Sequence, residues 1–139
     1  IANNGWASEL LELDVEKAPN TVVVSQPLAG LTLKSTVHHD RGYVYARELD
    51  GRLLIGGGRN WNCANEEERI SKLKAWAREH VTGASDFEAS VQWRGYLGVG
   101  LTRGPILRDL GNGLYAGVRM GGMGVAIGTV VGRKLASMV

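Results

Sequence analysis

The last quarter of the chain contains a strand-like segment that leads through a glycine-rich turn into a helix-like segment. Leu114 to Val118 has the pattern of a short strand, residues 119–124 hold the turn, and the helix is expected to begin near Gly122. Glycines at such a junction leave backbone N–H groups unpaired at the positive end of the helix dipole. This point therefore favours an electron-rich partner, such as a phosphate, a carboxylate or a ring carbonyl.

Length and composition are those of an ordinary globular domain. The chain has 139 residues, of which 44% are hydrophobic and 22% charged, and its net charge of +2 is too small to indicate a nucleic acid partner. The longest apolar run, residues 123–131, is about half of what a membrane span requires. The single cysteine, Cys63, cannot form an internal disulfide, and no signal peptide is recognisable. We therefore expect a cytoplasmic protein without a membrane span.

The middle of the chain has the pattern of an antiparallel sheet. Residues 22–27 and 42–48 favour strands, and Asp50-Gly51 is a strong hairpin signal that returns residues 52–56 as a partner strand. Residues 88–97 alternate in polarity and predict a further strand.

One amphipathic helix is expected to cover this sheet. Asn65 is a suitable N-cap, three glutamates follow in the first turn, and the apolar residues that recur at helical spacing are Ile70, Leu73, Ala77 and Val81. The sequence thus predicts an α+β fold with a mostly antiparallel sheet within residues 14–112. The terminal pieces, 1–13 with a short helix from Trp6 and 113–139 with its strand and helix, are expected to lie outside that sheet.

A polar stripe on the strand at 42–48 is the first candidate site. Tyr43, Tyr45 and Arg47 point to one face, and Val44 and Ala46 point to the other. The stripe is interpreted either as a solvent-exposed face or as a wall over a ligand, with tyrosine hydroxyls as hydrogen-bond donors and arginine as a carboxylate fork. Trp93 is likewise interpreted as core packing or as an aromatic wall.

The turn at 119–124 is the second candidate site. Arg119 lies beside the glycines, and arginine binds carboxylates bidentately. Gly124, Gly128 and Gly132 fall on one helical face, which favours close packing against a sheet or a flat ligand. The turn matches neither a phosphate loop nor a G-x-G-x-x-G fingerprint. His38 and His39 would point to opposite faces of a strand, so no metal site is predicted.

Four segments, in order, resemble the C-terminal part of the flavin-dependent oxidoreductase family that includes D-amino-acid oxidase, glycine oxidase and sarcosine oxidase. The segments are Ile1-Ala-Asn-Asn-Gly-Trp-Ala; Tyr43-Val-Tyr-Ala-Arg with Asp50-Gly-Arg-Leu-Leu-Ile-Gly-Gly; Trp93-Arg-Gly with Gly104-Pro-Ile; and Asn112 through Gly132. They resemble the family's "A-x-G", "Y-x-x-P-R…G-R-L-x-x-G" and "W-x-G…P-x-I-G" motifs and its closing strand, glycine loop and helix.

The resemblance implies FAD as the cofactor and residues 1–5 as the last strand of a dinucleotide-binding domain whose N-terminal part is missing from this fragment. Residues 1–13 and 113–139 would then be C-terminal pieces of an incomplete FAD-binding domain, and 14–112 the substrate-binding domain. No cysteine lies between Gly95 and Pro105, where some members attach flavin, so non-covalent FAD is expected. The expected cofactor-binding residues are Asn4, Gly5, Arg119, Met120, Gly121, Gly122, Met123 and Gly124.

The family oxidises a C–N bond of an amino acid or amine by hydride transfer to flavin, so the resemblance implies an oxidoreductase with a small amine or amino-acid substrate. We expect the full-length protein to be the active form and the fragment alone to be inactive. The expected substrate-binding residues are Tyr43, Tyr45, Arg47, Trp93 and Arg119. One departure is the apolar Leu97, which falls near the position of a family arginine. The alternative interpretation is an independent α+β ligand-binding or protein-interaction module without redox activity.

Overall fold

The computed structural model describes residues 1–139, which form two compact units: residues 20–95, and residues 1–19 together with 96–139. Each unit has its own cluster of buried hydrophobic residues. The elements in chain order are η1 (Asn4–Glu9), β1 (Glu16–Ser25), β2 (Val37–His39), η2 (Asp40–Gly42), β3 (Val44–Leu49), β4 (Arg52–Gly57), α1 (Glu66–His80), β5 (Ala89–Val99), β6 (Ile106–Gly111), β7 (Leu114–Val118) and α2 (Gly124–Ala136).

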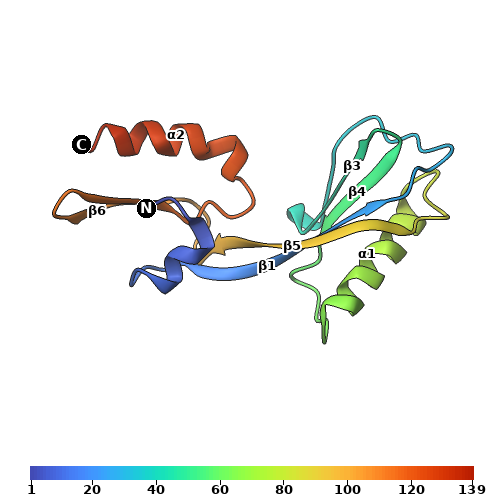
Figure 1. The fold of residues 1–139 in the computed structure, drawn as a ribbon, viewed down its shortest axis with the longest axis horizontal. Coiled ribbons are helices and arrows are strands. Elements are labelled where there is room, and N and C mark those ends of the chain that lie inside the picture. The colour runs from blue at the N-terminus through green and yellow to red at the C-terminus, as the bar shows by residue number, and fades with distance from the viewer. The chain divides into compact units, whose positions relative to one another are not determined.

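The larger sheet has five strands in the order β2-β3-β4-β1-β5; Figure 1 labels β1, β3, β4 and β5 of this sheet. The pairs β2–β3, β3–β4 and β4–β1 are antiparallel, which agrees with the mostly antiparallel sheet that the sequence predicted, although β2 itself was not predicted. Asp50 and Gly51 connect β3 to β4 with φ angles of 49° and 73°. Two consecutive positive φ angles match the tight hairpin turn that an Asp-Gly pair favours.

Helix α1 covers one face of this sheet, which confirms the predicted covering helix. The side chain of Asn65 caps its first turn by accepting a hydrogen bond of 2.9 Å from the Glu68 N–H. Leu73 and Ala77 are fully buried in the cluster that also holds Val44 and Ala46 of β3. The alternation along β3 therefore sends its apolar residues under the helix and leaves its polar stripe on the other face.

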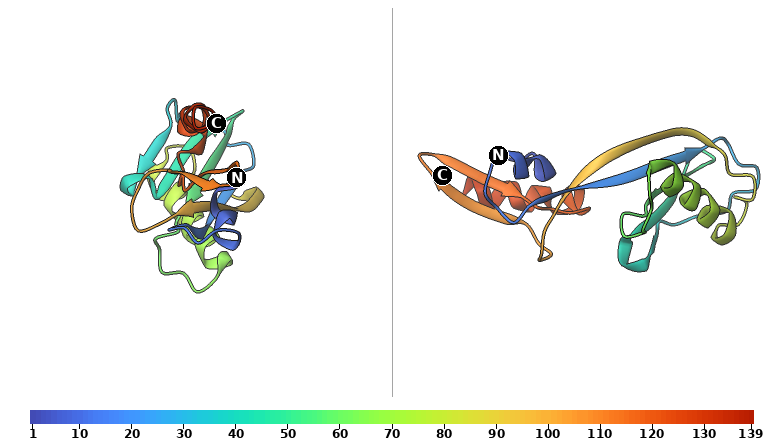
Figure 2. Two further views of the ribbon diagram at one scale, coloured as in Figure 1. Left: turned by 90° about the vertical axis from the view of Figure 1, so that its left-hand side faces the viewer. Right: turned by 90° about the horizontal axis from the view of Figure 1, so that it is seen from below.

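In the second unit, α2 packs on the hairpin of β6 and β7 (Figures 1 and 2). The close approach occurs at Gly117, where an added Cβ would lie 2.5 Å from Leu135 Cδ1 and 2.9 Å from Val131 Cγ1. Ile1 lies beside β7, because its ammonium donates to the Tyr115 carbonyl at 2.6 Å and its own carbonyl accepts from the Gly117 N–H at 2.9 Å.

The structure differs from the sequence-based expectation in the extent of several elements. The segment from Trp6 forms only the short 3₁₀ helix η1, and Trp6 is half exposed while Ala7 is buried. Strand β6 was not predicted, and its pairing with β7 joins residues 96–112 to the terminal unit. The compact units thus divide after residues 19 and 95, whereas the sequence analysis drew its boundaries after 13 and 112.

The glycine face of α2 is open within its unit. A Cβ at Gly128 or Gly132 would meet no atom within 4 Å, and one at Gly124 would meet only Met120 Cβ at 3.9 Å. These glycines are therefore not explained by packing on the β6–β7 sheet. Neither helix of the structure has the length and apolar character that crossing a bilayer demands.

Candidate active site

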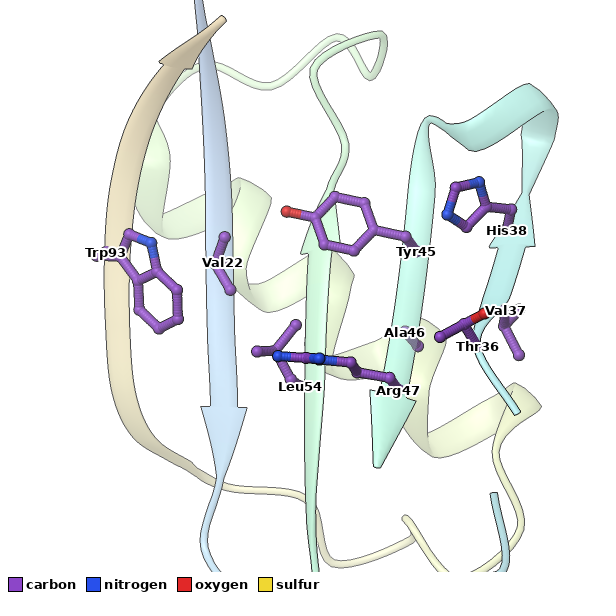
Figure 3. Close-up of a pocket in the computed structure, with 9 residues that line it drawn as sticks. All are labelled: Val22, Thr36, Val37, His38, Tyr45, Ala46, Arg47, Leu54 and Trp93. Carbon is purple, nitrogen blue, oxygen red and sulfur yellow. The ribbon is translucent and has the colours of Figure 1, made fainter. Parts of the chain in front are cut away.

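An open pocket of about 350 Å³ lies on the face of the larger sheet that points away from α1. Strands β1 to β5 supply most of its walls, and Figure 3 shows its side chains along these strands. The lining residues are Val22, Thr36, Val37, His38, Tyr45, Ala46, Arg47, Leu54 and Trp93. The pocket thus brings together Tyr45, Arg47 and Trp93, three of the five substrate-binding residues that the sequence analysis named.

Strand register explains how Tyr45 reaches the middle of this face. His38, Tyr45, Gly56 and Val22 are consecutive partners across four strands. Because Gly56 has no side chain, the Tyr45 ring lies across β4, and an added Cβ at Gly56 would be 2.5 Å from Tyr45 Cζ. The ring therefore extends from β3 across β4 toward β1, as Figure 3 shows.

The Tyr45 hydroxyl ends next to Asn20 of β1. The Asn20 amide nitrogen donates a hydrogen bond of 2.9 Å to Tyr45 Oη. Burial raises the pKa of the Tyr45 hydroxyl above its ordinary value, and the hydrogen bond from Asn20 opposes this rise. The phenol is consequently neutral near pH 7 and retains a proton that it can donate.

Arg47 supplies positive charge to the pocket. Its partner in the sheet register is Leu54, and its side chain lies across that residue in Figure 3. The residue is exposed, and no carboxylate of the 20–95 unit forms an ion pair with its guanidinium. A planar cation above an apolar residue can bind a carboxylate with two parallel hydrogen bonds.

Trp93 and His38 complete the two ends of the pocket (Figure 3). Trp93 is 47% exposed on β5, an edge strand, which favours the aromatic-wall interpretation over core packing. The centroids of the His38 and Tyr45 rings are 6.5 Å apart. The sequence analysis did not assign His38 to the site, because the pairing of β2 with β3 that places it there has no local signal in the sequence.

Tyr43 lies outside the pocket. It precedes β3 at the end of η2. The Arg59 guanidinium lies over its ring, 4.4 Å from the ring centroid. A role for Tyr43 in substrate binding remains a prediction.

The glycine loop that follows β7 is held by residues far away in the sequence. The Arg119 guanidinium forms an ion pair with the Asp14 carboxylate, and its Nε donates to the Gly104 carbonyl at 2.9 Å. The Met120 N–H donates to Asn4 Oδ1 at 2.9 Å, and the Gly121 N–H donates to the Gly98 carbonyl at 2.9 Å. Arg119 and Asn4 thus fix the loop in this structure.

The following N–H groups are free within the same unit. The backbone nitrogens of Gly122, Gly124 and Val125 have no acceptor among residues 1–19 and 96–139. A Cβ at Gly122 would meet no atom within 4 Å, so no side chain covers this end of α2. Several uncovered N–H groups at a helix N-terminus fit an electron-rich group such as the carbonyl-bearing edge of a flavin ring.

The structure contains no group of three His, Cys, Asp or Glu side chains that could hold a metal ion together. Each unit therefore has its own candidate site: the 20–95 unit has the pocket, which carries a cation and a hydroxyl, and the other unit has the loop, which carries uncovered N–H groups.

Comparison with known proteins gives the class of this chain. Its fold is similar to that of iminodiacetate oxidase from Chelativorans sp. BNC1, with a TM-score of 0.74, 19% identity and coverage of 97% of this chain and 40% of that chain. Glycine oxidase from Bacillus cereus ATCC 14579 gives a TM-score of 0.75 and 20% identity over 99% of this chain and 40% of that chain. Glycine oxidase from Geobacillus kaustophilus gives a TM-score of 0.70 and 20% identity, with coverage of 94% of this chain and 36% of that chain.

These solved structures show that the chain has the fold of part of these oxidases. The chain spans about 40% of the length of the first two. No curated protein sequence matches it. The family model described as DAO, FAD dependent oxidoreductase, matches residues 1–138. The chain therefore belongs to this family of FAD-dependent oxidoreductases, which confirms the resemblance and the expected cofactor class.

Proposed function

We propose that this chain is the substrate-binding part of an oxidoreductase that oxidises the C–N bond of a small amine or amino acid carrying a carboxylate. The observation that carries the proposal is the pocket on the larger sheet, where the unpaired cation of Arg47 lies near the neutral hydroxyl of Tyr45. Membership of the FAD-dependent oxidoreductase family supports the reaction class.

In this proposal each side chain has a role that follows from its chemistry. Arg47 binds the substrate carboxylate through its planar fork, and Tyr45 donates a hydrogen bond to it. Trp93 and Leu54 provide apolar contacts for the remainder of the substrate and exclude water from it. Positioning is then the main contribution of these residues to the rate.

The loop at 119–124 is proposed to contact the cofactor through its backbone. FAD, when bound, supplies the acceptor for the hydride that leaves the substrate α-carbon. The free N–H groups of Gly122, Gly124 and Val125 would hold an electron-rich edge of its ring without a covalent bond. We further propose that the dinucleotide part of FAD is bound by residues outside this chain, since the chain contains no G-x-G-x-x-G sequence and spans 40% of its structural relatives.

The test is a substitution of Arg47 in the FAD-loaded protein, with Arg41→Ala as the control for an exposed arginine of the same unit. For a carboxylate-bearing amine, Arg47→Ala should raise KM by roughly 10-fold to 100-fold, and Arg47→Lys should recover part of the loss. An amine without a carboxylate should show no such change. Equal effects on both kinds of substrate would contradict the proposed role of the pocket.

A further inference from the structure

The hydrogen bond between Asn20 and Tyr45 determines which way the Tyr45 proton points. A phenolic oxygen has one proton to donate and can accept from other groups. Here Tyr45 Oη accepts from the Asn20 amide at 2.9 Å, and no acceptor of the 20–95 unit takes the Tyr45 proton. The proton is therefore left for a group outside the protein.

The surroundings of the hydroxyl restrict where that group can lie. The Tyr45 ring packs on the backbone of β4 at Gly56, where an added Cβ would lie 2.5 Å from Tyr45 Cζ. On the other side lies the pocket, which Tyr45 lines together with Arg47 and Val22. A group that accepts the proton therefore sits in the pocket, on the same side as the Arg47 guanidinium (Figure 3).

We infer that Asn20 is a positioning residue that fixes the Tyr45 hydroxyl as a hydrogen-bond donor to an acceptor oxygen of the substrate. This inference rests on the proposed function, because it assigns the acceptor to the carboxylate that Arg47 binds. It also gives a specificity: a ligand that presents a donor at this point, such as an ammonium or an amide nitrogen, would face the Tyr45 proton and is rejected.

The direction of the hydrogen bond can be measured without any ligand. Asn20→Leu removes the amide donor and keeps the branched shape and the number of side-chain heavy atoms, so the Tyr45 ring stays covered at this point. A donor to the phenolic oxygen favours the phenolate, and its loss should raise the pKa of Tyr45. The measurement is the tyrosinate fraction at a fixed alkaline pH, observed by ¹³Cζ-tyrosine NMR of the full chain and assigned with Tyr45→Phe. A larger tyrosinate fraction in Asn20→Leu would overturn the inference.

The consequence for binding is measured with benzoate in the FAD-loaded protein, from the change in flavin absorbance. Asn20→Asp replaces the amide by a group that accepts the Tyr45 proton, so the affinity for benzoate should fall by about tenfold. Tyr45→Phe should remove most of this loss in the double variant, because Asn20 acts through the hydroxyl. An equal loss with and without the hydroxyl would show that residue 20 acts by charge alone and would overturn the inference.

The two tests separate this inference from the proposed function. If Asn20→Asp leaves the affinity for benzoate unchanged while Arg47→Ala still lowers it, the inference is overturned and the proposed function stands. If Arg47→Ala leaves benzoate binding unchanged, the proposed function fails, and the sign of the Tyr45 pKa change still decides the direction of the hydroxyl.

Discussion

The guanidinium of Arg119 is ion-paired with the carboxylate of Asp14, 105 residues away in the sequence. The Arg119 side chain is only 12% exposed, and its Nε donates to the Gly104 carbonyl. The sequence analysis proposed Arg119 as a substrate residue on the ground of its position beside the glycine loop. In this structure its charge is balanced internally, whereas the charge of Arg47 is free to meet a ligand.

Disruption of the Asp14–Arg119 pair should first affect stability. Arg119→Ala leaves the Asp14 carboxylate and the Gly104 carbonyl without their donor, so the free energy of unfolding should fall by about 1–3 kcal/mol. The measurement is the urea midpoint of unfolding, with Arg103→Ala as the control for an exposed arginine of the same unit. If Arg119→Ala keeps the midpoint and raises KM for the carboxylate substrate, Arg119 is a substrate residue after all.

Gly56→Ala should fill the space above the β4 backbone that the Tyr45 ring occupies. Its new methyl group would overlap the ring, so Tyr45 must turn away from β4 and lose its hydrogen bond with Asn20. We expect the KM for a carboxylate-bearing amine to rise about tenfold, which is near the effect of Tyr45→Phe. The double variant Gly56→Ala, Tyr45→Phe should be no worse than Gly56→Ala alone, and a further loss would show that the alanine acts on another residue.

Two glycines of the terminal unit form a matched pair. Gly117→Ala should cost about 1–3 kcal/mol, because its Cβ would press against Val131 and Leu135 of α2. Gly128→Ala, in the open face of α2, should instead stabilise the isolated chain by up to about 1 kcal/mol through its helix propensity. Denaturant midpoints of the two variants measure both effects.

The same Gly128→Ala variant tests what covers the open face of α2 when flavin is bound. If a further part of the protein or the cofactor packs closely there, the alanine should lower the flavin content of the FAD-loaded protein, measured by absorbance. An unchanged flavin content would mean that the glycine face is not needed for the cofactor.

Stability should depend on the ionisation of Glu88 at acid pH. The hydrogen bond from Lys74 lowers the pKa of the Glu88 carboxyl below its ordinary value of 4.5, and the charges of Lys74 and Arg78 act in the same direction. Because the pKa in the folded state is the lower one, the unfolded state binds the proton more readily. The contribution of Glu88 is therefore complete above the ordinary pKa and is lost as the pH falls through the folded-state value.

The check is the urea midpoint between pH 7 and pH 3. Glu88→Gln should flatten the fall of the midpoint at acid pH, since it removes the titrating group that joins α1 to the start of β5. Glu12→Gln, a substitution of an exposed glutamate, should leave the fall unchanged. A parallel fall in Glu88→Gln would show that the ion pairs of Glu88 do not contribute to folding.

The sequence predicted those features that depend on neighbouring residues along the chain. Asn65 and the glutamates after it predicted where α1 begins, and Asp50-Gly51 predicted the hairpin, because caps and tight turns are local structures. The alternation in β3 predicted that Tyr45 and Arg47 share the face opposite Val44 and Ala46. The order of the motifs predicted the family.

Only the tertiary structure decided which of these residues meet. Strand β1 lies between β4 and β5, and this order brings Trp93 to the pocket and Asn20 to the Tyr45 hydroxyl. Strand β6 becomes a strand through its pairing with β7, and Asp14 reaches Arg119 through the folding of the terminal unit. Such contacts join residues that are distant in the chain, so no local preference for helix, strand or turn could indicate them.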